Sequence, residues 1–185
     1  IVHNPAFAQA ESQHMVAEII EALDKANSDL LIASSIVTVD TDGYALTGVL
    51  ISRNGIQLRQ NQTHSNQHHA NWQSKFGNEF KTIDTAFGRI AIVVGHDSIY
   101  PEVFRMLAIQ DVEVVLSPTH ITESWEVTTG LLERAAENRI NIVAASRKTE
   151  AGSSIILGLD EDFTLWTEWK KRSFDGNINY PLVTK

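Results

Sequence analysis

The sequence predicts an α/β fold built around one buried strand, and three features of the chain indicate it. Residues 90–94 (Ile-Ala-Ile-Val-Val) form an uninterrupted apolar run, which is typical of a strand buried on both faces. A few residues later, Pro101-Glu102 predicts the start of a helix, because proline suits a first helical turn and an acid complements the helix dipole. Segments with helical spacing and short strand-like segments alternate through most of the chain.

The other elements are predicted from apolar spacing and turn chemistry. Residues 1–10 show no clear periodicity, whereas residues 12–26 have apolar side chains at helical spacing, with acids on the opposite face. Asn54-Gly55 is a strong hairpin signal between two predicted strands. Apolar spacing predicts the remaining helices at 101–109 and 125–138. Strands are predicted at 30–36, 44–52, 56–59, 112–116, 140–145 and 155–159, and a further segment at 163–168 follows a turn.

Length and composition limit the classes of protein that fit. A chain of 185 residues predicts a single domain, spanning 1–185, with a full core. The net charge of −8 argues against nucleic-acid partners and anionic membrane surfaces. No apolar stretch approaches the roughly 20 residues needed to span a bilayer, and signal-peptide architecture is absent, so we expect a cytoplasmic protein. The chain begins at Ile1 and its first methionine is Met15, so we expect processing, trimming or a longer parent polypeptide.

Polar residues directly follow the predicted central strand. Gly95 ends the apolar run, and His96, Asp97 and Ser98 come next. The mouth of a strand–helix turn is where α/β proteins usually build their sites, so these residues are the first candidates. The sequence contains no cysteine, which excludes disulfides, thiolate metal sites and any cysteine nucleophile.

Residues 84–102 resemble the signature of the nitrilase superfamily of carbon–nitrogen hydrolases. The family pattern is Asp-Thr-Pro-Phe-Gly-Arg-Ile-Gly, an apolar strand, Cys-aromatic-acid, and an aromatic residue before Pro-Glu. This chain has Asp84-Thr85-Ala86-Phe87-Gly88-Arg89-Ile90-Ala91 and then Tyr100-Pro101-Glu102. Laid on the pattern, the catalytic cysteine falls on Gly95, its aromatic neighbour on His96 and the acid on Asp97. The family's catalytic lysine falls on Gln62, and blocks at Ser117-Pro118 and 134–138 extend the resemblance over residues 12–165.

The resemblance implies an α-β-β-α sandwich of the nitrilase type. It is N-terminally incomplete here, because nothing before Ser12 matches the family's opening unit, whose Phe-Pro-Glu supplies a glutamate. We therefore expect an upstream segment or a partner chain to complete the fold. The resemblance also implies a homodimer formed through the helices at 101–109 and 125–138. In the family, a thiolate attacks an amide or nitrile carbon, the lysine stabilises the oxyanion and the glutamate is the general base. With Gly95 and Gln62 in these positions, that mechanism cannot run.

Two classes of function remain open. The first is a catalytically silent family member that acts as a scaffold, a regulatory subunit or a binder of a small amide or carboxylate, with Gly95 and Gln62 as degenerate catalytic positions. The alternative is a divergent hydrolase of non-peptide carbon–nitrogen bonds that uses His96 and Asp97, with Ser98, or residues from an upstream segment. Against it, adjacent residues at a strand end point to opposite sides. A simpler interpretation is that Asp97 caps the turn or the helix at Pro101, and that His96 fills the space of the family's aromatic residue.

A metal site is a further possibility, because histidines gather in the polar stretch that follows residue 62. His64 with His68 or His69 could join His96 and His120 if this loop folds over the strand ends. No fixed-spacing motif is present, and histidines in a polar loop are more often solvated. We therefore predict neither a metal nor another cofactor.

Three other side chains have structural interpretations. Trp166 and Trp169 are expected to pack against the core or a subunit edge. Arg134 is expected to pair with Glu102 or Glu137 as an internal brace.

Overall fold

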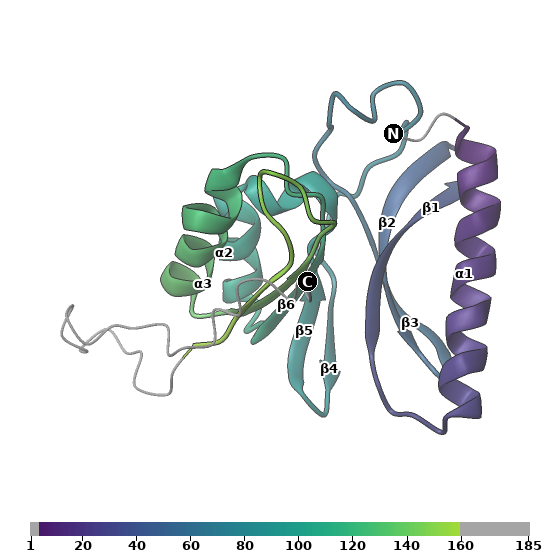
Figure 1. Cartoon of the computed structure of the whole chain (residues 1–185), viewed down its shortest axis with the longest axis horizontal. Helices are drawn as coiled ribbons and strands as arrows, with labels where there is room; N and C mark the ends of the chain where they lie inside the picture. Colours follow the sequence, from purple (N-terminus) through teal and green to yellow (C-terminus); the bar gives the residue numbers. More distant parts are fainter. Residues whose placement is uncertain (1–3, 160–185) are drawn as a thin grey trace.

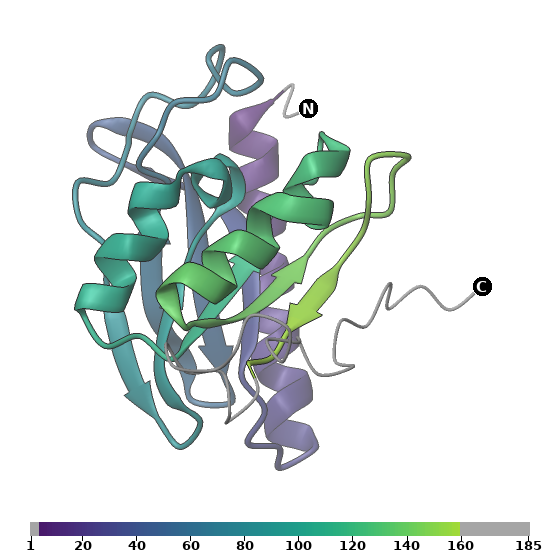
Figure 2. The ribbon, with the colours of Figure 1, turned by 90° about the vertical axis from the view of Figure 1, so that its left-hand side faces the viewer.

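The computed structural model describes residues 4–159, in which two β-sheets stack face to face with helices on their outer faces (Figure 1). Helix α1 (Pro5–Lys25) covers one sheet. Helices α2 (Pro101–Ile109) and α3 (Leu131–Asn138) lie side by side over the other (Figure 2). The layers follow the order α-β-β-α, which confirms the predicted fold class. The segment predicted at 163–168, with its two tryptophans, lies outside the described residues.

The first sheet is an antiparallel meander of β1 (Ile32–Asp40), β2 (Gly43–Ser52) and β3 (Gly55–Asn61). Its β2–β3 connection is the hairpin predicted from Asn54-Gly55. Helix α1 begins at Pro5, so the predicted start at residue 12 is wrong. A cap sets this start: Asn4 Oδ1 accepts a hydrogen bond from the backbone N–H of Phe7 at 3.1 Å, and proline occupies the first turn.

The second sheet has the strand order β4-β5-β6-β7-β8, with three parallel strands in the centre and an antiparallel strand at each edge. The strands are β4 (Thr82–Thr85), β5 (Gly88–Ile92), β6 (Val114–Pro118), β7 (Asn141–Ala145) and β8 (Ile155–Leu157). The sequence does not predict β4, because Thr-Ile-Asp-Thr contains a single apolar side chain. Its pairing with β5 makes it a strand.

The predicted helix at 125–138 consists of two parts. Residues 126–130 form a π-helical turn, and α3 follows it. Buried Glu126 fixes the segment that precedes this turn, because its Oε1 accepts the backbone N–H groups of Thr122 at 2.9 Å and Glu123 at 2.8 Å. Arg134 pairs with Glu137 at 2.7 Å, one of the two partners expected from the sequence. Within residues 4–159, every helix is too short or too polar to cross a membrane.

Side-chain alternation along the strands divides the core into layers. In β2, Val49 faces α1 and Leu50 faces the second sheet. In β5, Ala91 packs under α2 and α3, and Ile92 packs between the sheets. Both faces of β5 are therefore buried, which explains its continuous apolar run. Gly48 permits the close approach of the sheets, because a Cβ there would collide with the side chain of Ile92.

Candidate functional site

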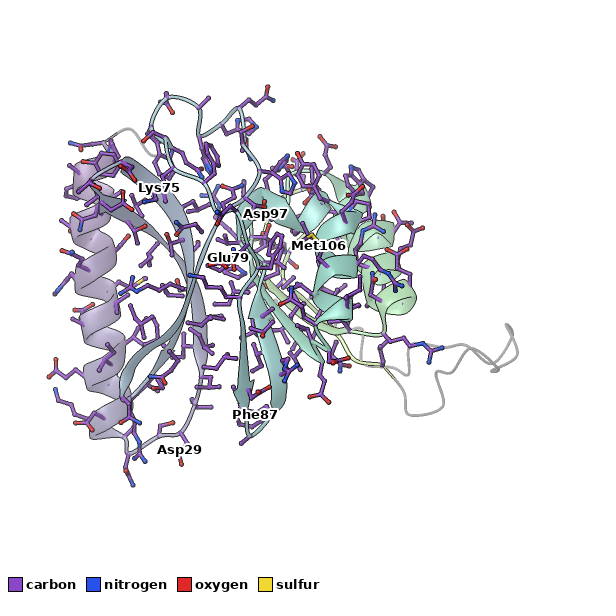
Figure 3. All side chains as sticks on the ribbon, turned by 180° about the vertical axis from the view of Figure 1, so that it is seen from behind. Asp29, Lys75, Glu79, Phe87, Asp97 and Met106 are labelled. Carbon is purple, nitrogen blue, oxygen red and sulfur yellow. The ribbon has the colours of Figure 1, made fainter. Side chains whose placement is uncertain are left out.

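The candidate site lies where β3 and β5 end. Figure 3 places Asp97 between the two sheets, at the end of the molecule opposite to Phe87 and Asp29. Gly95 begins a 3₁₀ turn, Gly95–Ile99, and has a left-handed φ of +58°. Its carbonyl oxygen accepts hydrogen bonds from Ser98 Oγ at 3.0 Å and from Thr119 Oγ1 at 2.9 Å. The two hydroxyls hold the turn in a conformation that strains any residue with a Cβ.

Gln62 is the first residue after β3, and it lies against Gly95. A Cβ added to Gly95 would lie 3.5 Å from Nε2 of Gln62, so the structure brings together these two sequence-predicted positions. The backbone of Gln62 is fixed on both sides: its N–H donates to the carbonyl of Leu46 at 2.9 Å, and its carbonyl accepts the N–H of Gly77 at 2.8 Å. Its side chain is 0% exposed, and among the described residues neither Nε2 nor Oε1 has a hydrogen-bond partner.

Gln60, in β3, is a buried glutamine whose side-chain nitrogen and oxygen both form hydrogen bonds. It is 2% exposed, and its Nε2 donates to the carbonyls of Asn61 at 2.9 Å and Glu79 at 2.8 Å. Its Oε1 accepts the N–H of Lys81 at 2.9 Å. Buried polar atoms are nearly always satisfied in this way. The unused donor and acceptor of Gln62 therefore indicate that something beyond residues 4–159, such as a water or a ligand, completes its contacts.

Asp97 fixes the loop that follows β3. Its carboxylate is 0% exposed and accepts four hydrogen bonds from that loop. The donors are the backbone N–H of Thr63 at 2.8 Å, Thr63 Oγ1 at 3.0 Å, the backbone N–H of His64 at 2.9 Å and Nδ1 of His64 at 2.8 Å. The interpretation that Asp97 caps the turn or α2 is wrong, since neither start has a side-chain cap. The carboxylate points across to the other sheet's loop instead.

His64 is the residue of this site whose role the sequence does not reveal. A carboxylate only accepts, so Nδ1 of His64 carries the proton that it shares with Asp97, and Nε2 is left with a lone pair when the ring is neutral. The ring stacks on Tyr100 with centroids 3.8 Å apart and planes 13° apart. Its side chain is 38% exposed, so solvent reaches it. Its place two residues after Gln62 is the sequence signal that could have indicated it.

The constellation of His96, Asp97 and Ser98 is not assembled as a triad. These residues lie on a 3₁₀ turn rather than at an extended strand end, so the expected alternation of side chains does not apply. Ser98 Oγ is bonded to Gly95 and Thr119, and Asp97 is bonded to His64. His96 meets Tyr100 edge-on, with ring centroids 6.2 Å apart. The histidine beside the carboxylate is therefore His64.

The loop above the site, residues 62–81 between β3 and β4, contains further polar atoms without partners among the described residues. Seven buried side-chain polar atoms within residues 4–159 lack a partner, and five of them belong to Gln62, His69, Trp72 and Gln73. The His69 and Trp72 rings lie 5.1 Å apart. Burial lowers the pKa of His69, and the nearby charges of His68 and His96 lower it further, while the neighbouring Gln73 side chain opposes the shift.

The chemistry open to this arrangement is hydrogen bonding and proton exchange. In the described part of the chain, no three His, Asp or Glu side chains gather as metal ligands would, so the metal hypothesis finds no support there. The described grooves, such as one of about 250 Å³ between α1 and β1, are lined by other residues. In the site, the Gln62 amide is fully buried and the His64 ring is partly exposed to solvent.

The fold is an α-β-β-α sandwich in which the 3₁₀ turn that follows β5 begins with a glycine, Gly95. A family model for carbon-nitrogen hydrolases matches residues 2–170, and the chain belongs to this family. The resemblance stated from the sequence is thereby confirmed.

Known relatives agree with this assignment. A probable nitrilase of Schizosaccharomyces pombe is 31% identical over 77 residues, which are 40% of this chain and 28% of that protein. The structure of the NitN amidase of Nesterenkonia sp. AN1 matches with a TM-score of 0.68 and 18% identity, over 84% of this chain and 67% of that one. A cysteine-to-alanine variant of the same amidase, in complex with butyramide, matches with a TM-score of 0.68 and 18% identity, over 84% of this chain and 65% of that chain.

Proposed function

We propose that this carbon-nitrogen hydrolase family member lacks the standard Glu-Lys-Cys chemistry and binds a small amide or carboxylate without turning it over. The sequence has no cysteine, and the nucleophile position is Gly95. The observation that carries the proposal is the buried, unpartnered carboxamide of Gln62 beside Gly95. An amide or carboxyl group offers the acceptor, and in its amide or acid form the donor, that Gln62 lacks. Such a protein would serve as a regulatory subunit or a binding scaffold.

Butyramide is a suitable first probe, because a fold relative has been solved in complex with it. We expect saturation-transfer NMR to detect butyramide binding to the wild-type chain. Gln62→Leu, which keeps the volume and removes both polar atoms, should weaken binding about tenfold or more, the effect of one or two lost hydrogen bonds. Gln57→Leu, an exposed position on β3, is the matched control and should bind as wild type does. Absence of binding by wild type, or equal binding by Gln62→Leu, refutes the proposal.

A divergent hydrolase is the second candidate, and the contact between Asp97 and His64 is the observation that favours it. A histidine held by a buried carboxylate is suited to act as a general base toward water. The discriminating assay is ammonia release from a panel of amides, nitriles and ureido acids, with His64→Ala and His96→Ala run beside wild type. Release that disappears in either variant would replace the binding proposal. No release, under conditions where an authentic family enzyme responds, leaves the binding proposal in place.

We further propose that two copies associate through α2 and the helical segment 125–138. Support comes from three exposed large apolar side chains there, those of Met106, Ile109 and Trp125. Sedimentation velocity should give a dimer for wild type and a monomer for Ile109→Glu. Leu30→Glu, an exposed apolar position elsewhere, should remain dimeric.

An upstream segment or a partner chain is proposed to complete the first sheet. Among the described residues, β1 and β3 each pair only with β2, which leaves two strand edges open. The chain also spans 67% of the amidase structure that it matches.

A further inference from the structure

The surroundings of the site are poor in acids, although the chain as a whole is acidic. The net charge is −8, yet the sequence from Gly43 to Asn78 contains no aspartate or glutamate. This stretch includes β2, β3 and the loop above the site, with three histidines in that loop. Asp97 is buried in the site, and four donors share its charge. A negatively charged ligand therefore meets little repulsion here.

His64 is arranged to respond to such a ligand. Its Nδ1–H is held by Asp97 at 2.8 Å, and the ring is clamped by stacking on Tyr100. The free nitrogen is Nε2, on the opposite side of the ring from Asp97. Protonation of Nε2 gives an imidazolium that donates to Asp97 through Nδ1 and to a second acceptor through Nε2. Two carboxylates, one from the protein and one from a ligand, would satisfy both donors.

Gln62 and His64 belong to one short segment that packs against residues 95–97. The segments 62–64 and 95–97 contact each other twice, at Gln62 with Gly95 and at His64 with Asp97. Two residues of chain span at most about 7 Å between Cα atoms, so Gln62 and His64 extend from neighbouring points of one loop, within the reach of a ligand of a few bonds' length.

We propose that His64, positioned by Asp97, makes the site selective for carboxylates by taking up one proton when an anionic ligand binds. The inference rests on the proposed binding function and names its ligand class. The ligand is ionised in solution, the proton comes from the solvent, and the bound state contains the imidazolium between two carboxylates. The other titratable groups that face this ring are Tyr100, on which it stacks, and His96, on the edge of Tyr100; His69 lies near His96.

Butyrate and butyramide are the test pair, because they match in size and differ in charge. Their affinities for the full chain are measured by NMR titration from pH 6 to pH 8, where butyrate stays ionised. For wild type, butyrate affinity should fall as pH rises, by up to about tenfold per pH unit for one linked proton, while butyramide affinity stays level. His64→Gln should remove the pH dependence of butyrate binding. His14→Gln, an exposed histidine on α1, should retain it.

The outcomes separate the two ideas. If wild type binds neither ligand, both the proposed function and this inference fail. If butyramide binds but butyrate affinity is independent of pH, or keeps its pH dependence in His64→Gln, only the proton-linked selectivity fails. If His96→Gln loses the pH dependence of butyrate affinity and His64→Gln retains it, the effect belongs to His96 and the inference is overturned.

Discussion

The same substitution at two positions of one strand end should change stability in opposite directions. Gln60→Leu removes three hydrogen bonds to backbone groups, at 2.8–2.9 Å, and leaves those groups buried without partners. At about 1 kcal/mol per bond, the loss is about 3 kcal/mol. Gln62→Leu removes two buried polar atoms that have no partner within residues 4–159. Relief of their desolvation should raise the free energy of unfolding by about 1–2 kcal/mol.

Urea denaturation of the ligand-free chain, followed by circular dichroism, measures both changes on one scale. Wild type and Gln57→Leu provide the reference, because an exposed glutamine should leave the midpoint nearly unchanged. A gain for Gln62→Leu means that the wild-type amide is kept at the expense of stability, as expected of a binding group. A loss for Gln62→Leu comparable to that of Gln60→Leu would refute the reasoning, because the amide would then be part of the structural hydrogen-bond network.

Three further predictions address the turn and the loop around it. Asp97→Ala should lower the free energy of unfolding by about 3 kcal/mol, since it leaves buried donors of Thr63 and His64 unpaired. The control Asp84→Ala breaks an exposed ion pair with Arg89 and should change the free energy of unfolding little, so equal urea midpoints for the two variants would contradict the prediction. Gly95→Ala should cost about 1–2 kcal/mol in the same assay because of its φ of +58°, and an unchanged midpoint would show that the turn relaxes freely. The pKa of His69 is lowered in the folded state, so the unfolded state binds a proton first and stability declines as pH falls from about 6.5 through the folded-state pKa. His69→Asn should flatten this decline between pH 8 and 5. Parallel curves of unfolding free energy against pH for wild type and His69→Asn would disprove it.

The turn that begins at Gly95 is fixed by contacts from both sheets. Gly95 has a left-handed φ, its carbonyl accepts two hydroxyl donors, and Asp97 holds the loop after β3 against the turn. These contacts stabilise the fold independently of a nucleophile, because they join the two sheets.

Local patterns in the sequence determined the elements of this protein. The apolar run at 90–94 identified a strand buried on both faces, because sheet-on-sheet packing leaves it no polar face. Proline at residue 101 and Asn54-Gly55 marked a helix start and a hairpin through their backbone preferences. The sequence did not reveal the α1 start at Pro5 or the edge strand β4, since a cap and a neighbouring strand decide these.

The partners of the side chains within the site depend on how the two sheets and their loops pack together. The sequence placed Gln62 and Gly95 as equivalents of catalytic positions, but it gave no sign that the Gln62 amide is buried and unpartnered while that of Gln60 is fully bonded. It paired Asp97 with its neighbour His96, whereas the structure pairs it with His64, 33 residues away. Adjacent residues on a 3₁₀ turn project in different directions, and the packing of one sheet's loop against the other sheet brings distant side chains together. Periodicity describes which face of an element is buried, and it does not specify which loop will lie across it.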